Sequence, residues 1–279
     1  LTIGAADMGT GCDTTLSQIA AECLECSVDD IVVYGADTDF SPYDSGSYAS
    51  STAYVTGKAV ERACRELKEK MTVIASELLS VPASDLVFAA DGIGTADGKA
   101  KVSLAKIAAK SMNGNNEAVQ ATVSHSSPVS PPPFMAGMVE LEVDKETGAV
   151  EILDYAAVVD CGTPLNSNLV KVQTEGGLAQ GIGMALYEDV TYNERGRIYE
   201  DSFMQYKIPT RLDVGKLRVE FESSYEETGP FGAKSIGEIV INTPSPAIAH
   251  AIYNATGVWH RELPITPEKV LRGILSHEN

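Results

Sequence analysis

Residues 134–160, which read FMAGMVELEVDKETGAVEILDYAAVVD, decide the fold class. Over Phe134–Val143 apolar residues alternate with polar or small ones, and the pattern resumes over Ala149–Asp160 after the turn Lys145–Gly148. This stretch predicts a β-hairpin. Because helical periodicity lies on both sides of it, we expect an α+β protein with two α/β subdomains, mixed sheets and flanking helices.

The residues before the hairpin form the first expected subdomain, residues 1–125. A polar, proline-rich stretch over 113–133 is typical of a linker. The expected elements are, in order, a strand over 1–8, a helix over 13–26, a strand over 30–35, a helix over 52–79, a strand over 86–89 and a helix over 103–112. Residues 126–279 form the second subdomain, which adds a Gly-rich helix over 175–187 and closing helices over 245–256 and 267–275.

The composition disfavours several classes of partner. The chain has 279 residues, of which 44% are hydrophobic and 22% charged, and this suits a globular protein with a substantial core. Its formal net charge of −18 would repel nucleic acid and anionic membranes. The sequence shows neither an apolar run of about 20 residues nor a signal-peptide pattern. We therefore expect a soluble, cytoplasmic protein with no nucleic acid or membrane partner.

Three glycine-bearing segments stand where helices are expected to begin: Met8–Gly11, Gly176–Gly181 and Gly232–Gly237. Glycine allows a ligand to approach the backbone, and helix N-termini present N–H groups to anions. Such glycines also serve turns and tight packing, so each segment alone leaves both interpretations open. The loop Gly46–Thr52 offers hydroxyls and N–H donors ahead of another helix, which fits either a phosphate cradle or a polar helix cap.

Glu238 follows Lys-Ser-Ile-Gly and precedes Ile-Val-Ile. An apolar setting raises the pKa of a carboxyl and suits a catalytic base, whereas a solvated Glu, or one paired with Lys234, would have no such role. Both interpretations stay open on the residues alone. The four histidines lack metal-ligand spacing, and no nucleophile elbow indicates a hydrolase. The pair Cys23 and Cys26 has the C-x-x-C spacing, which we interpret as helix thiols.

Taken together, these segments resemble the second molybdopterin-binding domain of the molybdenum hydroxylases, the family of xanthine dehydrogenase and aldehyde oxidase. The matching blocks follow the family's order and cover nearly the whole chain. They are DMGTGCDTTLSQIAAE, GSYASSTAYVTGKAV, SPVSPPPFMAGMVELEVDKETGAVEI, VVDCGTPLN, QTEGGLAQGIGMALYE, GAKSIGE, PAIAHAIYNATG and LPITPEKV.

The resemblance implies a molybdenum atom held by the dithiolene of molybdopterin, in its cytosine dinucleotide form, with no protein ligands to the metal. Glu238 would be the catalytic base in the hydroxylation of an N-heteroaromatic substrate of the xanthine, hypoxanthine or nicotinate type, with oxygen taken from water. Carried over position by position, the cofactor-binding residues are Gly9, Thr10, Gly11, Ala49, Ser50, Ser51, Thr52, Gln180, Lys234, Ser235 and Gly237.

The resemblance also implies partners, because the sequence holds neither an iron–sulfur nor a flavin signature. We expect 2Fe-2S clusters on an iron-sulfur subunit, FAD on an FAD subunit, and a first molybdopterin-binding half of the large subunit. The start at Leu1 fits the split subunit of a nicotinate dehydrogenase-like enzyme and a cropped xanthine dehydrogenase chain equally well. Two alternatives stay open. One is a non-catalytic cofactor-binding or assembly paralogue, favoured by Thr10 where the family commonly has Gln, and the other is an isolated domain fragment that is inactive without its partner half.

Overall fold

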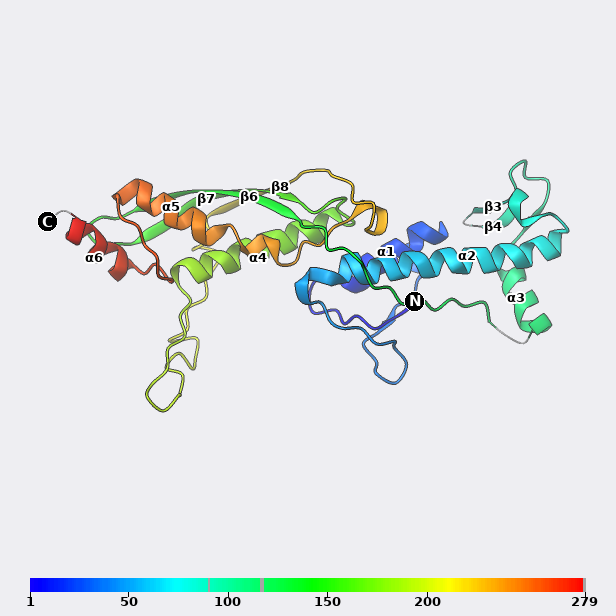
Figure 1. Cartoon of the computed structure of the whole chain (residues 1–279), viewed down its shortest axis with the longest axis horizontal. Coiled ribbons are helices and arrows are strands. Elements are labelled where there is room, and N and C mark those ends of the chain that lie inside the picture. Colours follow the sequence, from blue (N-terminus) through cyan, green and yellow to red (C-terminus); the bar gives the residue numbers. More distant parts are fainter. Residues whose placement is uncertain (90, 116–117, 278–279) are drawn as a thin grey trace. The chain divides into compact units, whose positions relative to one another are not determined.

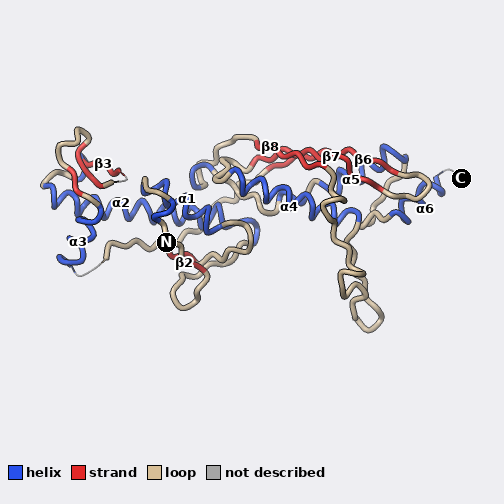
Figure 2. Tube along the Cα trace, turned by 180° about the vertical axis from the view of Figure 1, so that it is seen from behind, coloured by secondary structure: helices blue, strands red, loops and turns tan. Residues whose placement is uncertain are grey.

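The computed structural model describes residues 1–89, 91–115 and 118–277, and the chain has an α+β fold (Figures 1 and 2). It divides into two compact units. The first comprises Leu1–Pro131 and Tyr225–Ser235, and the second comprises Pro132–Ser224 and Ile236–Asn279. The sequence placed a single division near residue 125, whereas Tyr225–Ser235 folds with the first unit. Residues 116–117 of the expected linker lie outside the described residues.

Two helices form the frame of the first unit. α1 (Cys12–Leu24) packs along α2 (Gly57–Leu79), and a short π-helix, Thr52–Thr56, leads into α2. α1 ends where Glu25 adopts a left-handed φ of 53°, and its N–H group bonds the carbonyls of the last turn. Ser80 ends α2 in the same way.

The strands of the first unit are short. They are β1 (Thr2–Ile3), β2 (Tyr34–Gly35), β3 (Leu86–Ala89), β4 (Gly92–Thr95) and β5 (Lys101–Val102). β1 and β2 form a two-stranded parallel sheet, which is much shorter than the strands predicted over 1–8 and 30–35. β3, β4 and β5 form an antiparallel sheet that packs with α3 (Leu104–Asn115) on the C-terminal half of α2. Their shared core is Ala75, Phe88, Ile93, Val102 and Ile107.

The predicted hairpin is confirmed and forms the centre of the second unit. β6 (Phe134–Val143) pairs antiparallel with β7 (Val150–Asp160), and β7 pairs parallel with β8 (Lys216–Phe221), so the sheet is mixed. α4 (Ser167–Leu186) and α5 (Pro244–Thr256) cover one face of this sheet (Figures 1 and 2).

The core of the second unit lies between the helices and this face of the sheet, and α6 (Pro267–His277) closes one end of it. Its fully buried members include Ile182, Ile248 and Ile252. Each buried isoleucine side chain contributes roughly 1.5–3 kcal/mol to stability. The two closing helices that the sequence predicts are both present.

Two further observations concern membrane-spanning helices and the cysteines. Among the described residues, no helix is long and apolar enough to cross a membrane. All five cysteines are free thiols, with Cys23 inside α1 and Cys26 just after its end.

Candidate functional site

The sequence-predicted site residues are divided between the two units. The first unit holds most of the predicted cofactor contacts: Gly9, Thr10, Gly11, Ala49, Ser50, Ser51, Thr52, Lys234 and Ser235. The second unit holds Gln180, Gly237 and Glu238.

Asp7 closes the turn between β1 and α1. Its Oδ1 atom accepts hydrogen bonds from the backbone N–H groups of Gly9 (2.9 Å) and Gly11 (3.2 Å). The bond from Gly9 is the main cause that holds the pKa of the Asp7 carboxyl below its usual value. Gly11 caps α1 with a φ of 73°, a left-handed conformation that favours glycine. The N–H groups that the sequence predicted to grip a ligand therefore bind Asp7 in this structure.

The loop Gly46–Thr52 has a strained backbone. Ala49 (φ 51°) and Ser50 (φ 57°) are both left-handed, although neither is glycine. This conformation costs about 1–3 kcal/mol per residue and clusters at ligand sites. The strain thus falls on two of the residues that the sequence assigned to the cofactor.

Hydroxyl groups fix the shape of this loop. Ser51 Oγ donates to the carbonyl of Gly46 (3.1 Å), and Thr52 Oγ1 donates to Ser47 Oγ (2.7 Å). Both bonds stay inside the loop, so Ser51 and Thr52 hold its conformation.

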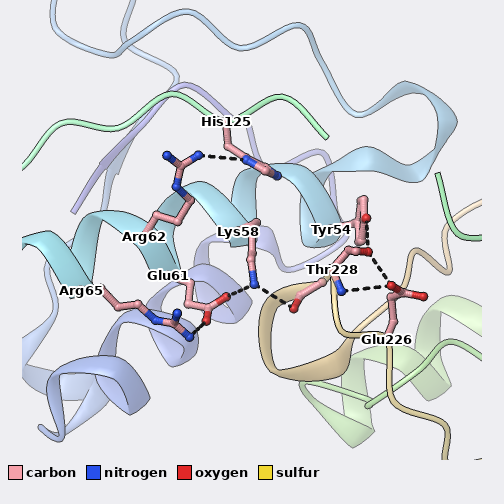
Figure 3. Close-up of polar contacts among 9 residues, drawn as sticks. Tyr54, Lys58, Glu61, Arg62, Arg65, His125, Glu226 and Thr228 are labelled. Atoms are coloured by element: carbon pink, nitrogen blue, oxygen red, sulfur yellow. Dashed lines mark hydrogen bonds and ion pairs between the residues drawn. The ribbon is translucent and has the colours of Figure 1, made fainter. Parts of the chain in front are cut away.

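Segment 225–235 is tied to the start of α2 (Figure 3). The hydroxyl oxygens of Tyr54 and Thr228 lie 2.6 Å apart, and Lys58 Nζ donates to the carbonyl of Gly229 (3.3 Å). The N–H group of Thr228 also donates to Glu226 Oε1 (3.0 Å). These contacts position the segment that leads to Lys234 and Ser235.

A buried carboxylate lies beside this contact. Glu61 is almost fully buried, and Lys58 Nζ lies 2.8 Å from its Oε2 atom, while Arg65 pairs with its Oε1 atom (Figure 3). Two cations offset the cost of removing this charge from water. The next residue, Arg62, contacts His125 Nδ1 (3.2 Å), and burial, with the charge of Arg62 adding to it, lowers the pKa of His125.

The same segment carries left-handed residues close to Lys234. Phe231 has a φ of 50° and Gly232 a φ of 85°. Lys234 is half-buried, and its charge helps to lower the pKa of Glu226, although the main cause there is the hydrogen bond from the Thr228 hydroxyl. Like the loop at Ala49, the segment adopts a conformation that ordinary side chains disfavour.

Sequence reasoning missed Asp7, Tyr54, Lys58 and Thr228. Asp7 had a local signal, because an Asp two residues before glycine commonly accepts backbone N–H groups in a turn. Tyr54 and Thr228 are 174 residues apart, and no local pattern joins them.

Glu238 begins the short 3₁₀ helix Ile239–Ile241 in the second unit. Its carbonyl accepts the N–H group of Ile241 (3.3 Å), and Val240 is buried against the unit. Glu238 itself is exposed. The apolar setting that the sequence suggested for Glu238 is therefore wrong, because the residues after it do not enclose its carboxylate. Val240 points into the core of the second unit, while Glu238 lies at its surface.

Two glycines of α4 pack against this 3₁₀ helix and the start of α5. A Cβ atom at Gly177 would lie 2.2 Å from Val240 Cγ2, and one at Gly181 would lie 2.6 Å from Pro244 Cγ. The prediction that these glycines stand at the mouth of a helix is wrong, because the Asn166 side chain caps α4 at its start and accepts two backbone N–H groups there. Gln180 lies exposed on this helix.

The chain matches a family model over residues 1–215, and that model is described as a molybdopterin cofactor-binding domain. The match covers well over half of the chain. The chain therefore belongs to the molybdopterin-binding domain family of the molybdenum hydroxylases.

Curated relatives and solved structures agree with this assignment. The chain is 36% identical to the probable hypoxanthine oxidase of Escherichia coli and 31% identical to the 6-hydroxypseudooxynicotine dehydrogenase complex subunit gamma of Paenarthrobacter nicotinovorans, with 97% and 96% of this chain covered. It spans 28% and 35% of those two proteins. The crystal structure of quinoline 2-oxidoreductase from Pseudomonas putida superimposes with a TM-score of 0.89 at 29% identity, over 97% of this chain and 36% of that one.

Proposed function

We propose that this chain is the cofactor-binding component of a molybdenum hydroxylase, which holds molybdopterin as the cytosine dinucleotide and uses Glu238 as its catalytic base. One observation carries the proposal. Within the part that matches the family model, Ala49 and Ser50 are both held in a left-handed conformation at positions assigned to the cofactor. Such strain persists where the surrounding structure and a ligand require it.

The first unit has suitable space and chemistry for the cofactor. A Cβ atom at Gly9 or at Gly46 would meet no atom of the chain within 4 Å, so both turns are open to a ligand. Thr10 and Lys234 offer a hydroxyl and a cation to a pyrophosphate. Asp7 already accepts the N–H groups of Gly9 and Gly11. We therefore propose that this turn contacts the cofactor through the Thr10 side chain and the open surface of the glycines. The remaining proposed contacts are Gly11, Ala49, Ser50, Ser51, Thr52, Gln180, Ser235 and Gly237.

The bound cofactor would supply molybdenum as a two-electron acceptor and an oxygen atom that derives from water. Glu238 would take up a proton at a carboxylate oxygen while the substrate carbon is attacked. The exposure of Glu238 suits this role, because the carboxylate can reach a ligand that lies outside the chain. We propose an N-heteroaromatic substrate. The names of three similar proteins, a hypoxanthine oxidase, a nicotine 6-hydroxylase and a quinoline 2-oxidoreductase, support this class.

Electrons would leave the molybdenum site through partner subunits. Relatives are named as a complex subunit, a large subunit and a large chain, which supports an assembly of several subunits. We propose that the first molybdopterin-binding half, an iron-sulfur subunit with 2Fe-2S clusters and an FAD subunit complete it.

Elemental analysis of natively purified protein tests the proposal. We expect about one molybdenum atom per chain, together with iron, and release of a cytidine nucleotide on acid hydrolysis. A substrate screen of purines, nicotinate and quinoline would follow. Molybdenum without turnover of any of these would favour a cofactor-binding or assembly paralogue, and protein that is free of molybdenum in its complete native assembly would contradict the proposal.

A further inference from the structure

Three of the five cysteines lie where the end of α1 packs beside α2 in the first unit (Figures 1 and 2). Cys23 is in the last turn of α1, Cys26 lies just beyond that helix, and Cys64 is in α2. Cys64 is buried, whereas Cys23 and Cys26 are half-buried. None of the three is among the residues that we assign to the cofactor or to catalysis, so their grouping needs a separate explanation.

The packing of α1 on α2 brings Cys23 to Cys64. One helical turn before Cys23, Ile19 Cδ1 lies 2.9 Å from the position that a Cβ atom at Gly57 would take. Cys64 follows Gly57 by about two turns of α2. Residues separated by whole turns share one face of a helix, so both cysteines lie on the faces that meet.

The thiols of Cys23 and Cys64 are hydrogen bonded to each other, with Cys23 as the donor. An ion pair closes the contact on its other side. Lys68, one turn after Cys64, places its Nζ atom 2.9 Å from Oε1 of Glu25, which lies just past the end of α1. Two cysteines can be bridged only where their side chains point toward each other, and this pair meets that condition.

The surroundings also favour a thiolate on this pair. The hydrogen bond from Cys23 is the main cause that lowers the pKa of Cys64 below its ordinary value of 9.0, and the charge of Lys68 lowers it further. The same hydrogen bond, together with burial, raises the pKa of Cys23. The first proton that the pair loses therefore leaves one thiolate bonded to one thiol, and the two sulfur atoms share the remaining proton.

Thiols that converge in this way serve either metal binding or redox chemistry. Among the described residues, the potential ligand atoms that gather closely enough for a metal ion belong to Asp7, Cys12 and Asp13, and neither Cys23 nor Cys64 is one of them. Redox chemistry needs only two sulfur atoms in contact, which is what the helices provide.

We propose that Cys23 and Cys64 are a redox-active pair, which hydrogen peroxide converts into a reversible disulfide that locks α1 to α2. The inference does not depend on the proposed cofactor or on Glu238. A disulfide in a protein from a reducing compartment is usually transient, in keeping with a bond that forms on oxidation and is reduced again afterwards.

The proposed reaction has two steps. Cys23 is the half-buried sulfur and the one that peroxide reaches; as the thiolate it attacks one peroxide oxygen, the S–O bond forms, the O–O bond breaks and hydroxide leaves. The Cys64 sulfur then attacks the Cys23 sulfenic acid, so that the S–S bond forms, the S–O bond breaks and water leaves. Overall, two thiols and one hydrogen peroxide give one disulfide and two waters, and the two electrons lost by sulfur reduce the peroxide.

The bond would restrain both helices of the first unit. α1 begins directly after the turn Gly9–Gly11, and α2 follows the loop Gly46–Thr52 through its π-helix. We therefore expect hydrogen exchange over Cys12–Leu24 and Gly57–Leu79 to slow when the protein is oxidised. Equal exchange before and after oxidation would contradict the lock.

Mass spectrometry of the natively purified protein tests the bond itself. The protein is reduced, freed of reductant and treated with hydrogen peroxide, and the remaining thiols are alkylated in denaturant. Glutamyl endopeptidase then cuts at Glu25 and so separates Cys23 from Cys26. We expect the peptides of Cys23 and Cys64 as one linked species that dithiothreitol separates. A link between Cys23 and Cys26, a sulfinic acid at Cys23 beside an alkylated Cys64, or two unmodified thiols would each overturn the proposal.

Cys12 is the internal control for the rate. It is buried, and its pKa is raised to about 12, mainly by burial, so it holds very little thiolate. We expect the linked species of Cys23 and Cys64 to form at least about tenfold faster than Cys12 is oxidised. Oxidation of all three at one rate would mean that the pair has no special reactivity.

A matched set of variants separates the pair from its neighbour. Cys26→Ser keeps both sulfurs of the pair and should form the linked species at the parent rate. Cys64→Ala removes the second thiol, so Cys23 should accumulate as a sulfenic acid that dimedone traps. Cys23→Ser changes the half-buried partner and should also abolish the link. Loss of the linked species in Cys26→Ser, or its persistence in Cys23→Ser, would show that the assignment of the pair is wrong.

Discussion

The hydroxyl oxygens of Tyr54 and Thr228 lie 2.6 Å apart, although 174 residues separate the two in the chain. Tyr54 is buried in the π-helix that follows the strained loop at Ala49 and Ser50. Thr228 belongs to the segment that leads to Lys234. The contact therefore joins two of the segments to which we assign cofactor binding, and both belong to the first unit.

Removal of this contact should loosen the segment. Thr228→Val keeps the shape of the side chain and deletes the hydroxyl, so we expect the free energy of unfolding to fall by about 1 kcal/mol, as for a typical hydrogen bond. Hydrogen exchange should also rise over Tyr225–Ser235. Thr228→Ser retains the hydroxyl and is the control. Equal protection of this segment in both variants would show that the contact does not hold it.

Acid should weaken the same segment. The bond from the Thr228 hydroxyl lowers the pKa of Glu226 from its ordinary value of 4.5. A carboxyl with a lowered pKa stabilises the fold fully above its unfolded pKa, and this contribution is lost as the pH falls through the folded value. We expect Glu226→Gln to be less stable than the parent near neutral pH and the two to converge below pH 4.5, as measured by urea unfolding. A constant difference across this range would contradict the prediction.

The packing of α4 beneath the Glu238 segment can be tested with two adjacent glycines. Gly177→Ala would place a Cβ atom 2.2 Å from Val240 Cγ2, so we expect a loss of about 1–3 kcal/mol and displacement of the 3₁₀ helix Ile239–Ile241. Gly176→Ala meets no atom within 4 Å and should stabilise the helix by about 0.5–1 kcal/mol. Thermal unfolding of both variants measures the difference. Similar melting temperatures would show that the backbone adjusts without cost.

Cys12 should be an unreactive thiol. Burial, and then the charges of Asp7 and Asp13, raise its pKa to about 12. Compared with its ordinary value of 9.0, this leaves roughly a thousandfold less thiolate at mildly alkaline pH. Iodoacetamide should therefore label Cys12 in unfolded protein but hardly at all in folded protein, as mass spectrometry of the labelled peptides would show. Rapid labelling of Cys12 in folded protein would mean that the turn around Asp7 opens readily.

The proposed role of Glu238 can be tested only in the assembled enzyme. Glu238→Gln removes the proposed base with little change in volume, so we expect turnover to fall by about 100-fold or more while the molybdenum content stays the same. Glu227→Gln, which changes an exposed carboxylate in the first unit, is the matched control and should keep normal turnover. Normal turnover of the Glu238→Gln variant would remove Glu238 from the mechanism.

Several elements could be predicted from the sequence because their signals are local. The alternation over residues 134–160 predicts the hairpin of β6 and β7, and the structure pairs Phe134 with Asp160 and Val143 with Val150 as that pattern requires. The long helix before Leu79 and the two closing helices are equally local. The start of α4 was missed, because a single side chain, that of Asn166, caps the helix well before its glycines.

The same distinction between local signals and long-range contacts applies to the candidate site. The sequence by itself determined the family and the order of its blocks, because these depend on which residues follow one another. Only the tertiary structure showed that Asp7 binds the N–H groups of Gly9 and Gly11, that Tyr54 meets Thr228, and that Glu238 stays exposed while Val240 is buried. These depend on competition for hydrogen-bond donors and for space in the core, which is settled only when distant parts of the chain pack together.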